Sequence, residues 1–319
     1  MIWLWLILLV AGFVLLVWSA DLFVEGTAAL ARNIGVSDLF IGLTAVSIGT
    51  SAPEIFIAIM DSFKFEPDIA IGNAIGSNVA NMGLVLGITA IVVPLPYDKR
   101  ILRSELPMLL IATVLAGICL IDLYLGRVDG IIFLTLFGFI MYRMFRSSKI
   151  SEQLPDELEN ALSDIPSMGT SRASIQALIG LVVLVISANY LIVAPARSLA
   201  EALHVEVFDV GTTIVAVGTS LPELVVTLRA AIKGGYGIAI GNIVGSNMLN
   251  LLVVLSVPAL MRPAPLTLME FVIDYGMMFL LTVVIALFAY AVGAKKVITR
   301  LEGALLLTAW VGYIVLKYT

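Results

Sequence analysis

Two pairs of near-identical segments recur along the chain at one constant spacing. Residues 42–54 (GLTAVSIGTSAPE) match residues 211–223 (GTTIVAVGTSLPE) at 8 of 13 positions. Residues 69–81 (IAIGNAIGSNVAN) match residues 238–250 (IAIGNIVGSNMLN) at 9 of 13 positions, and one offset without a gap aligns both pairs. The pattern predicts two copies of one structural unit, so the fold must contain the same helices twice.

The composition places this repeated unit in a membrane. Of the 319 residues, 61% are hydrophobic and only 13% are charged, whereas soluble domains are about half apolar and about a quarter charged. These values exclude a soluble enzyme, a nucleic-acid-binding protein and a disordered scaffold as descriptions of the whole chain. A single cysteine and a single histidine exclude a disulfide framework and multi-histidine metal sites. The first apolar segment lacks a basic region and a cleavage site, so we expect a membrane helix rather than a signal peptide.

The chain has ten segments that could each cross a membrane, where about 20 apolar residues of helix are needed. They are residues 2–20 (with a helical extension toward Arg32), 39–59, 69–93, 106–123, 131–144, 175–193, 210–228, 238–260, 271–292 and 304–317. We therefore predict an all-α integral membrane protein with ten transmembrane helices. Its two five-helix repeats are expected at 1–147 and 173–319, joined by a polar connector at 148–172.

Basic residues indicate how these helices are oriented. Thirteen of the lysines and arginines fall on one side of the expected spans and five on the other. By the positive-inside rule, both termini are then expected outside the cell and the connector in the cytoplasm. The second copy begins five helices after the first, an odd number, so it must be inverted. Inverted repeats are typical of secondary transporters that bind their cargo near the middle of the membrane.

Each repeat places one glutamate within an apolar span, Glu54 in the first and Glu223 in the second. An unpaired carboxylate in the hydrocarbon is costly, so such residues usually face the protein interior and serve function. The structural alternative is a carboxyl group that is protonated or paired with a basic side chain of another helix. Two carboxylates carry a charge that balances one calcium ion or two sodium ions, and a site that takes either load would exchange them by alternating access.

The neighbours of the glutamates supply only oxygen ligands. Thr50 and Ser51 lie four and three residues before Glu54, on the same helix face. Pro53 has no amide donor, so carbonyls of the preceding turn, from Ser47 onward, become available to a ligand. The second copy repeats this set with Thr219, Ser220 and Pro222, and with the carbonyls of the turn that begins at Ala216. The partner helices add hydroxyl and amide groups, from Ser77 and Asn81 in the first copy and from Ser246 and Asn250 in the second. Such all-oxygen sites suit hard cations such as calcium and sodium.

Other features allow more than one interpretation. The GxxxG pairs Gly72/Gly76 and Gly241/Gly245 indicate close helix packing. The acidic residues Asp21 and Glu25 lie at the inner end of the first helix, where they either line an ion path or are solvated. Asp274, in the ninth span, is expected to be structural rather than an ion or proton site.

The paired GTSxPE and GNxxGSNxxN segments, in both halves and separated by a polar connector, resemble the two alpha-repeats of the sodium/calcium exchanger family. The small size and short connector resemble a prokaryotic member. The resemblance implies four central cation sites, with the first and sixth helices sliding as a unit over the other eight. It also implies a role for each group: calcium ligation by Glu54 and Glu223, main-chain ligation by Thr50 and Thr219, sodium ligation by Ser51, Ser77, Ser220 and Ser246, and closure of the centre by Asn81 and Asn250.

In the family that the chain resembles, potassium-dependent relatives and some prokaryotic exchangers have an aspartate where this chain has Asn250, and this difference favours potassium-independent exchange. The leading hypothesis is therefore a potassium-independent antiporter that exchanges calcium for sodium in the cell membrane. A calcium/proton antiporter is the main alternative, and an antiporter of another divalent cation, a cation channel and an intramembrane hydrolase are less favoured. We expect no enzyme activity, no cofactor and no nucleic-acid partner, and we expect a functional monomer that interacts with sodium, calcium and the lipid bilayer.

Overall fold

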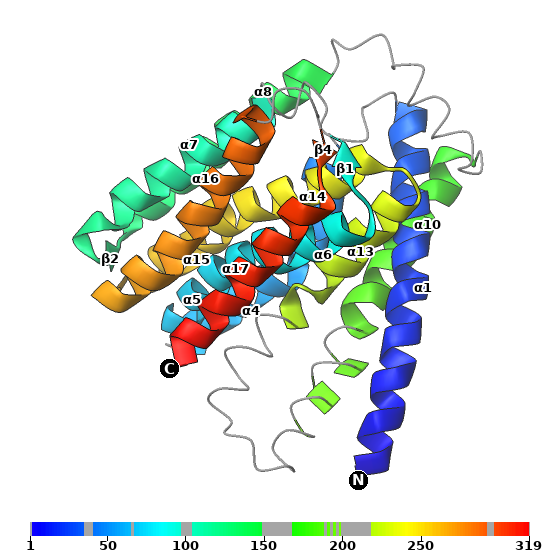
Figure 1. Ribbon diagram of the computed structural model, residues 1–319, viewed down its shortest axis with the longest axis horizontal. Helices are drawn as coiled ribbons and strands as arrows, with labels where there is room; N and C mark the ends of the chain where they lie inside the picture. The colour runs from blue at the N-terminus through cyan, green and yellow to red at the C-terminus, as the bar shows by residue number, and fades with distance from the viewer. Residues whose placement is uncertain are drawn as a thin grey trace.

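The computed structural model describes residues 2–34, 41–64, 67–96, 104–148, 168–187, 190–191, 194–195, 198, 218–291 and 297–318. Within these ranges the chain is nearly all helix (Figure 1). The first half contains α1 (Ile2–Ile34), η1 (Gly42–Val46), α3 (Ser47–Thr50), α4 (Ala52–Lys64), α5 (Pro67–Ala80), η2 (Asn81–Val85), α6 (Leu86–Val92), β1 (Leu95–Pro96), α7 (Leu106–Cys119), η4 (Leu120–Asp122), β2 (Tyr124–Leu125) and α8 (Arg127–Ser148).

The second half contains α10 (Thr170–Ile186), α13 (Leu221–Ile232), α14 (Tyr236–Leu249), η6 (Asn250–Val254), α15 (Ser256–Met261), β3 (Ala264–Pro265), η7 (Glu270–Tyr275), α16 (Gly276–Ala291), β4 (Val297–Ile298) and α17 (Arg300–Tyr318). The repeat seen in the sequence is present in these elements. Helix α5 and the π-helical segment η2 recur as α14 and η6, and β1 recurs as β3, with boundaries that differ by the same offset that aligns the repeated segments. The two halves therefore share one local structure around the repeated motifs.

Each half also breaks its helix just before the repeated glutamate. The segments Gly42–Thr50 and Ala52–Phe63 meet at an angle of 55°. Ser51, at the break, has φ −83° and ψ 9°, and Ser220 has nearly the same values, φ −85° and ψ 1°. A proline follows each serine by two residues, and its ring and missing N–H weaken the preceding turn. The weakening of the helix expected from Pro53 is seen as this bend before Glu54, and the second half has the same backbone geometry before Glu223.

The described residues contain four helices that are long and apolar enough to cross a membrane, or five if the bent pair is one span. The four are Trp3–Ile34, Ala70–Val92, Tyr236–Met261 and Glu270–Tyr290, and shorter apolar helices run over Leu106–Asp122 and Thr170–Ile186. The extension of the first helix beyond residue 20 is confirmed, because α1 continues to Ile34. Of the other expected spans, 131–144 and 304–317 are helical, whereas residues 210–217 and most of the connector lie outside the described residues.

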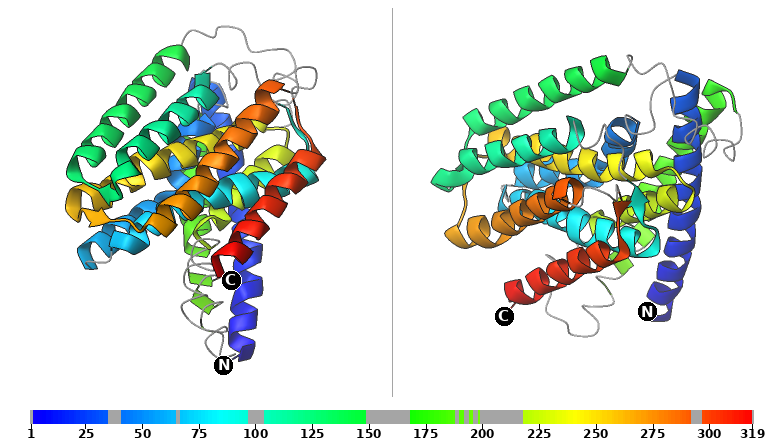
Figure 2. Two further views of the ribbon diagram at one scale, coloured as in Figure 1. Left: turned by 60° about the vertical axis from the view of Figure 1, so that its left-hand side comes forward. Right: turned by 45° about the horizontal axis from the view of Figure 1, so that its top comes forward.

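Helix α1 forms a close pair with α10 at one edge of the molecule (Figures 1 and 2). A Cβ atom on Gly26 would lie 2.6 Å from the backbone nitrogen of Ala177, and one on Gly180 would lie 2.6 Å from the backbone nitrogen of Phe23. The two backbones therefore touch through small residues, as is common where membrane helices associate. Much of the N-terminal part of α1 is exposed and apolar, which suits contact with lipid.

Two short strand pairs connect the halves. Strand β1 is antiparallel to β4, and β2 is antiparallel to β3. Each pair takes one strand from each half, so the ends of helices from different repeats are held together by backbone hydrogen bonds. Such bonds satisfy backbone groups where the helices end.

Helix α14 lies at the centre, and each of its residues from Ile238 to Leu249 is buried. It packs closely against η1 and α3, because a Cβ atom on Gly245 would lie 2.6 Å from Ser47 Oγ and 2.8 Å from the carbonyl oxygen of Leu43. The close packing expected from the second GxxxG pair is confirmed at Gly245. At Gly72, in the first pair, an added Cβ would meet nothing within 4 Å in the described part of the chain.

We expect Gly245→Ala to destabilise the protein by about 1–3 kcal/mol, because the added methyl group must displace backbone atoms of η1. The midpoint of thermal unfolding in detergent should fall by several degrees. Gly138→Ala in α8 is the matched control, since nothing lies within 4 Å of its added Cβ in the described residues. Equal unfolding midpoints for the two variants would contradict the close packing.

Candidate cation-binding site

Glu54 and Glu223 are each placed in the first turn of a helix that begins after a break, α4 for Glu54 and α13 for Glu223. Both side chains are fully buried. The first turn of a helix presents unpaired N–H groups and the positive end of the helix dipole, which stabilise a carboxylate. Such a position partly offsets the cost of burying a carboxylate inside the protein.

Serines from both halves converge on Glu223. Ser51 Oγ donates a hydrogen bond to Glu223 Oε1 over 3.0 Å, and Ser246 Oγ lies 3.5 Å from the same oxygen. Thr50 Oγ1 is 3.5 Å from Ser246 Oγ. The first-half break thus lies directly against the glutamate of the second half, as expected if the repeats share one site.

Two asparagines, Asn73 in α5 and Asn242 in α14, contact the threonines that precede the breaks. Thr50 Oγ1 donates to Asn242 Oδ1 over 3.0 Å, and Thr219 Oγ1 donates to Asn73 Oδ1 over 3.5 Å. Each contact joins one repeat to the other. A third amide contact, from Asn81 Nδ2 to Asn247 Oδ1 over 3.3 Å, also crosses between the repeats.

Many oxygen atoms in this region are buried and, among the described residues, have no hydrogen-bond partner. They are Glu54 Oε1 and Oε2, Glu223 Oε2, Ser77 Oγ, Asn78 Oδ1, Asn81 Oδ1, Ser220 Oγ and Asn250 Oδ1. An unsatisfied buried polar group costs about 1–3 kcal/mol. Unpaired acceptors of this kind, with two carboxylates among them, are suited to the binding of cations.

The unpaired oxygen atoms of this region include those of only two charged side chains, Glu54 and Glu223, which is fewer than most protein metal sites provide. Within the described ranges, no three His, Cys, Asp or Glu side chains come together as metal ligands. No ion pair in the same ranges involves Glu54 or Glu223. Neutral hydroxyl and amide oxygens would have to complete the coordination of any bound cation, which is typical of sodium and calcium rather than of softer metals.

All ten side chains predicted as ligands are buried, with at most 2% of their surface exposed: Thr50, Ser51, Glu54, Ser77, Asn81, Thr219, Ser220, Glu223, Ser246 and Asn250. Of the two carbonyl groups named with them, that of Ala216 lies outside the described residues. The Ser47 carbonyl accepts the Ser51 N–H over 2.9 Å and so takes part in the helix. Its role as a ligand stays a prediction.

Four buried asparagines were not singled out from the sequence: Asn73, Asn78, Asn242 and Asn247. Their identity between the two copies was the available signal, because polar residues kept at equivalent positions in two apolar spans must each have a partner or a role. The sequence alone did not show which helix they would face.

The acidic residues of α1 form ion pairs rather than standing alone. Asp21 accepts a hydrogen bond from Arg229 Nε over 2.7 Å and lies 3.0 Å from Lys233 Nζ. Glu25 lies 2.8 Å from Lys233 Nζ and 3.2 Å from Gln176 Nε2. These contacts connect α1 to both α13 and α10 at the end of α1 that carries Arg32.

Asp274 also has defined partners, which among the described residues lie on α17. Tyr313 donates a hydrogen bond to Asp274 Oδ1 over 2.6 Å, and Lys317 Nζ lies 3.0 and 3.1 Å from its two carboxylate oxygens. This arrangement joins η7 to α17 and agrees with the structural role expected for Asp274.

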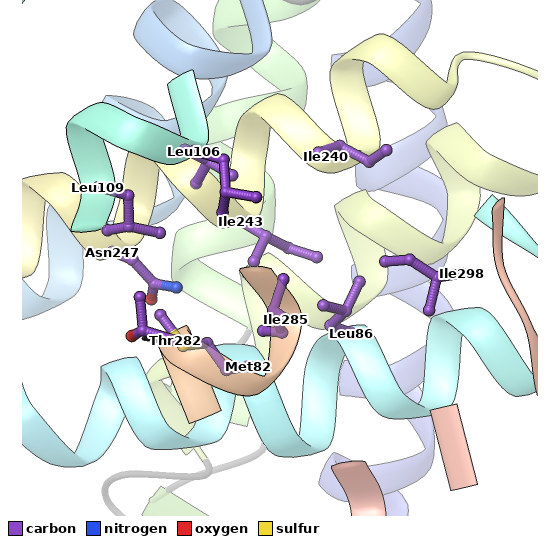
Figure 3. A pocket seen from close by; sticks show the side chains of 11 residues that line it. Met82, Leu86, Leu106, Leu109, Ile240, Ile243, Asn247, Thr282, Ile285 and Ile298 are labelled. Atoms are coloured by element: carbon purple, nitrogen blue, oxygen red, sulfur yellow. Dashed lines mark hydrogen bonds between the residues drawn. The ribbon is translucent and has the colours of Figure 1, made fainter. Parts of the chain in front are cut away.

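A small cavity of about 20 Å³ lies next to Asn247, whose side chain contacts Asn81, and has room for about one water molecule. Figure 3 shows that its lining is apolar apart from Asn247 and Thr282. None of the ten predicted ligands lines it. The cavity is therefore distinct from the oxygen-rich cluster and unsuited to a cation.

Comparison with known proteins agrees with this geometry. The chain matches the family model described as sodium/calcium exchanger protein over residues 4–146 and 173–319. It is 36% identical over 310 residues to the putative antiporter CaxA of Alkalimonas amylolytica, covering 96% of each chain. It is also 30% identical over a 355-residue alignment to sodium/calcium exchanger MaX1 of Methanosarcina acetivorans, covering 98% of each chain.

The fold has been seen before in a solved structure of the sodium-calcium exchanger NCX_Mj. That structure superimposes with a TM-score of 0.85 and 31% sequence identity, and the match covers 99% of both chains. Since the family model spans nearly all of the chain, the protein belongs to the sodium/calcium exchanger family.

Proposed function

We propose that this cation/calcium antiporter exchanges calcium for sodium across the cell membrane by alternating access and does not require potassium. The observation that carries the proposal is the cluster of unpaired, buried oxygen atoms around Glu54 and Glu223. Two carboxylates that form no ion pair within the described residues need cations for charge balance, and the neutral oxygens around them suit both sodium and calcium. The names of MaX1 and NCX_Mj, sodium/calcium exchangers, support the same assignment.

In this proposal each predicted ligand keeps its assigned role. Glu54 and Glu223 bind calcium with the main-chain carbonyls of Thr50 and Thr219, and the carbonyls of Ser47 and Ala216 are further cation ligands. Asn81 and Asn250 close the centre, and sodium is bound by the hydroxyl groups of the paired serines: Ser51, Ser77, Ser220 and Ser246. The contacts of Ser51 and Ser246 with one glutamate oxygen support a shared site.

We also propose ten transmembrane helices in two inverted five-helix repeats, residues 1–147 and 173–319, with a cytoplasmic connector at 148–172 and both termini outside. The common offset between equivalent elements supports two copies of one unit. The strand pairs that join the copies support an intertwined arrangement. The chain acts as a monomer, and the close pair of α1 and α10 moves relative to the other helices.

Uptake of radioactive calcium into proteoliposomes tests the coupling ion. Vesicles loaded with sodium and diluted into sodium-free buffer should take up calcium, and collapse of the proton gradient should not stop this. A matched set that carries only a proton gradient should show no uptake. Uptake that follows the proton gradient and ignores sodium would instead show a calcium/proton antiporter, with Glu54 and Glu223 as proton carriers.

We expect Glu54→Gln and Glu223→Gln each to reduce calcium uptake to the background of empty vesicles. Each change removes one of the two negative charges that balance the cation while keeping the size of the side chain. The measurement is initial uptake, with size-exclusion profiles in detergent to verify folding. Wild-type uptake by either variant would overturn the assignment of the site.

We expect Asn250→Asp to keep transport and to lower the half-saturating calcium concentration. The third carboxylate strengthens attraction of a divalent cation, and the Asn250 side chain makes no hydrogen bond in the described residues that the change would break. Uptake as a function of calcium concentration measures this effect. An unfolded variant would show that Asn250 has a structural role instead.

A further inference from the structure

Asn73 and Asn242 occupy equivalent places in the two halves, yet their side-chain amides are not equally supported. Asn242 Oδ1 accepts the hydroxyl proton of Thr50 over 3.0 Å, while its Nδ2 donates to Thr227 Oγ1 over 2.9 Å and lies 3.5 Å from the carbonyl oxygen of Glu223. Asn242 therefore connects the break before Glu54 with the helix that carries Glu223.

The first half lacks one member of this arrangement. The residue equivalent to Thr227 is Ala58, which is fully buried and has no hydroxyl group. Asn73 Nδ2 is buried and has no hydrogen-bond partner among the described residues. The contact between Thr219 and Asn73 Oδ1 is also longer, 3.5 Å against 3.0 Å.

We propose that Asn242 is a positioning residue for the cation site, and that Thr227 sets the orientation of its amide. The inference rests on the proposed function only in that the site binds calcium. Because Nδ2 donates to Thr227, Oδ1 faces Thr50 and accepts its hydroxyl proton. Thr50, Asn242 and Thr227 form the supported clamp, and Thr219 and Asn73 form the unsupported clamp.

The physical reason is that a side-chain amide has a hydrogen-bond acceptor at one end and a donor at the other. An asparagine can present either its oxygen or its NH₂ group to a neighbour, and the surrounding network decides which. Without an acceptor at position 227, the reversed amide would present a donor to Thr50, next to oxygens that must face a cation. Calcium binding must then also select the correct orientation of the Asn242 amide, and this selection reduces the free energy of calcium binding.

Direct calcium binding is the measurement, made by titration calorimetry on the purified full chain in detergent without any ion gradient. Thr227→Val removes the hydroxyl group at nearly constant size, and the dissociation constant for calcium should rise about 3- to 10-fold, the effect of one hydrogen bond. Thr227→Ser keeps the hydroxyl group and should restore wild-type binding. If serine binds calcium as weakly as valine, or if valine binds as tightly as threonine, the proposal is wrong.

A double variant shows whether Thr227 acts through Asn242. Asn242→Ala should weaken calcium binding at least as much as Thr227→Val, and adding Thr227→Val to Asn242→Ala should have little further effect. Independent, additive losses in the double variant would overturn the proposed order of contacts.

The first half provides the reverse test. Ala58→Ser supplies a hydroxyl group at the place equivalent to Thr227, as an acceptor for Asn73 Nδ2, and calcium binding should become about threefold tighter. Ala58→Cys is the matched control of similar size with a much weaker acceptor. Equal binding by the two variants would contradict the role of the unsupported clamp.

The calcium-binding titrations do not depend on whether sodium or protons drive transport. If vesicle uptake follows protons rather than sodium, the proposed function fails while calcium binding still reports on both clamps. If the wild-type protein binds no calcium, the positioning role and the proposed function fail together.

Discussion

The burial of two carboxylates in the middle of an apolar helical protein is the constraint on which the rest of the structure depends. Glu54 and Glu223 have no surface exposure and no ion pair within the described residues. Taking a charge out of water is costly unless other groups replace the water. The helix breaks, the first-turn positions and the surrounding hydroxyl and amide groups all serve that replacement, which explains why so many polar side chains of the core cluster here.

Much of the site could be predicted because its chemistry is local in the sequence. The break at Ser51 follows from Pro53, and the four-residue spacing of Ser77 and Asn81 places both on one helix face. Because the motif occurs in both halves, each of these inferences applied to the second copy as well. The same reasoning placed helical segments where the described residues form helices, although several helices, such as α4 and α8, extend beyond their expected ends. The number of membrane spans stays a prediction.

Other contacts could not be predicted, because they join residues far apart in the chain. Asp21 meets Arg229 across 208 positions, and Thr50 meets Asn242 across 192. Helical periodicity says which face of a helix is polar but not which other helix it meets. The supported and unsupported clamps and the ion pairs of α1 depend on such long-range contacts. The difference between Thr227 and Ala58 gains its meaning only from the positions of Asn242 and Asn73 in the folded protein.

The common offset between the two copies has a consequence for how they have diverged. From α5 through β1 the offset to the second copy stays constant, but it is larger between β2 and β4, so chain length has changed after β1. One inserted residue in a helix rotates all later side chains by about 100°. An insertion between Gly42 and Asn81 would turn ligands away from the centre, whereas the connecting segments after β1 could lengthen freely. The duplicated copies therefore remain in register at the site and have lost that register outside it.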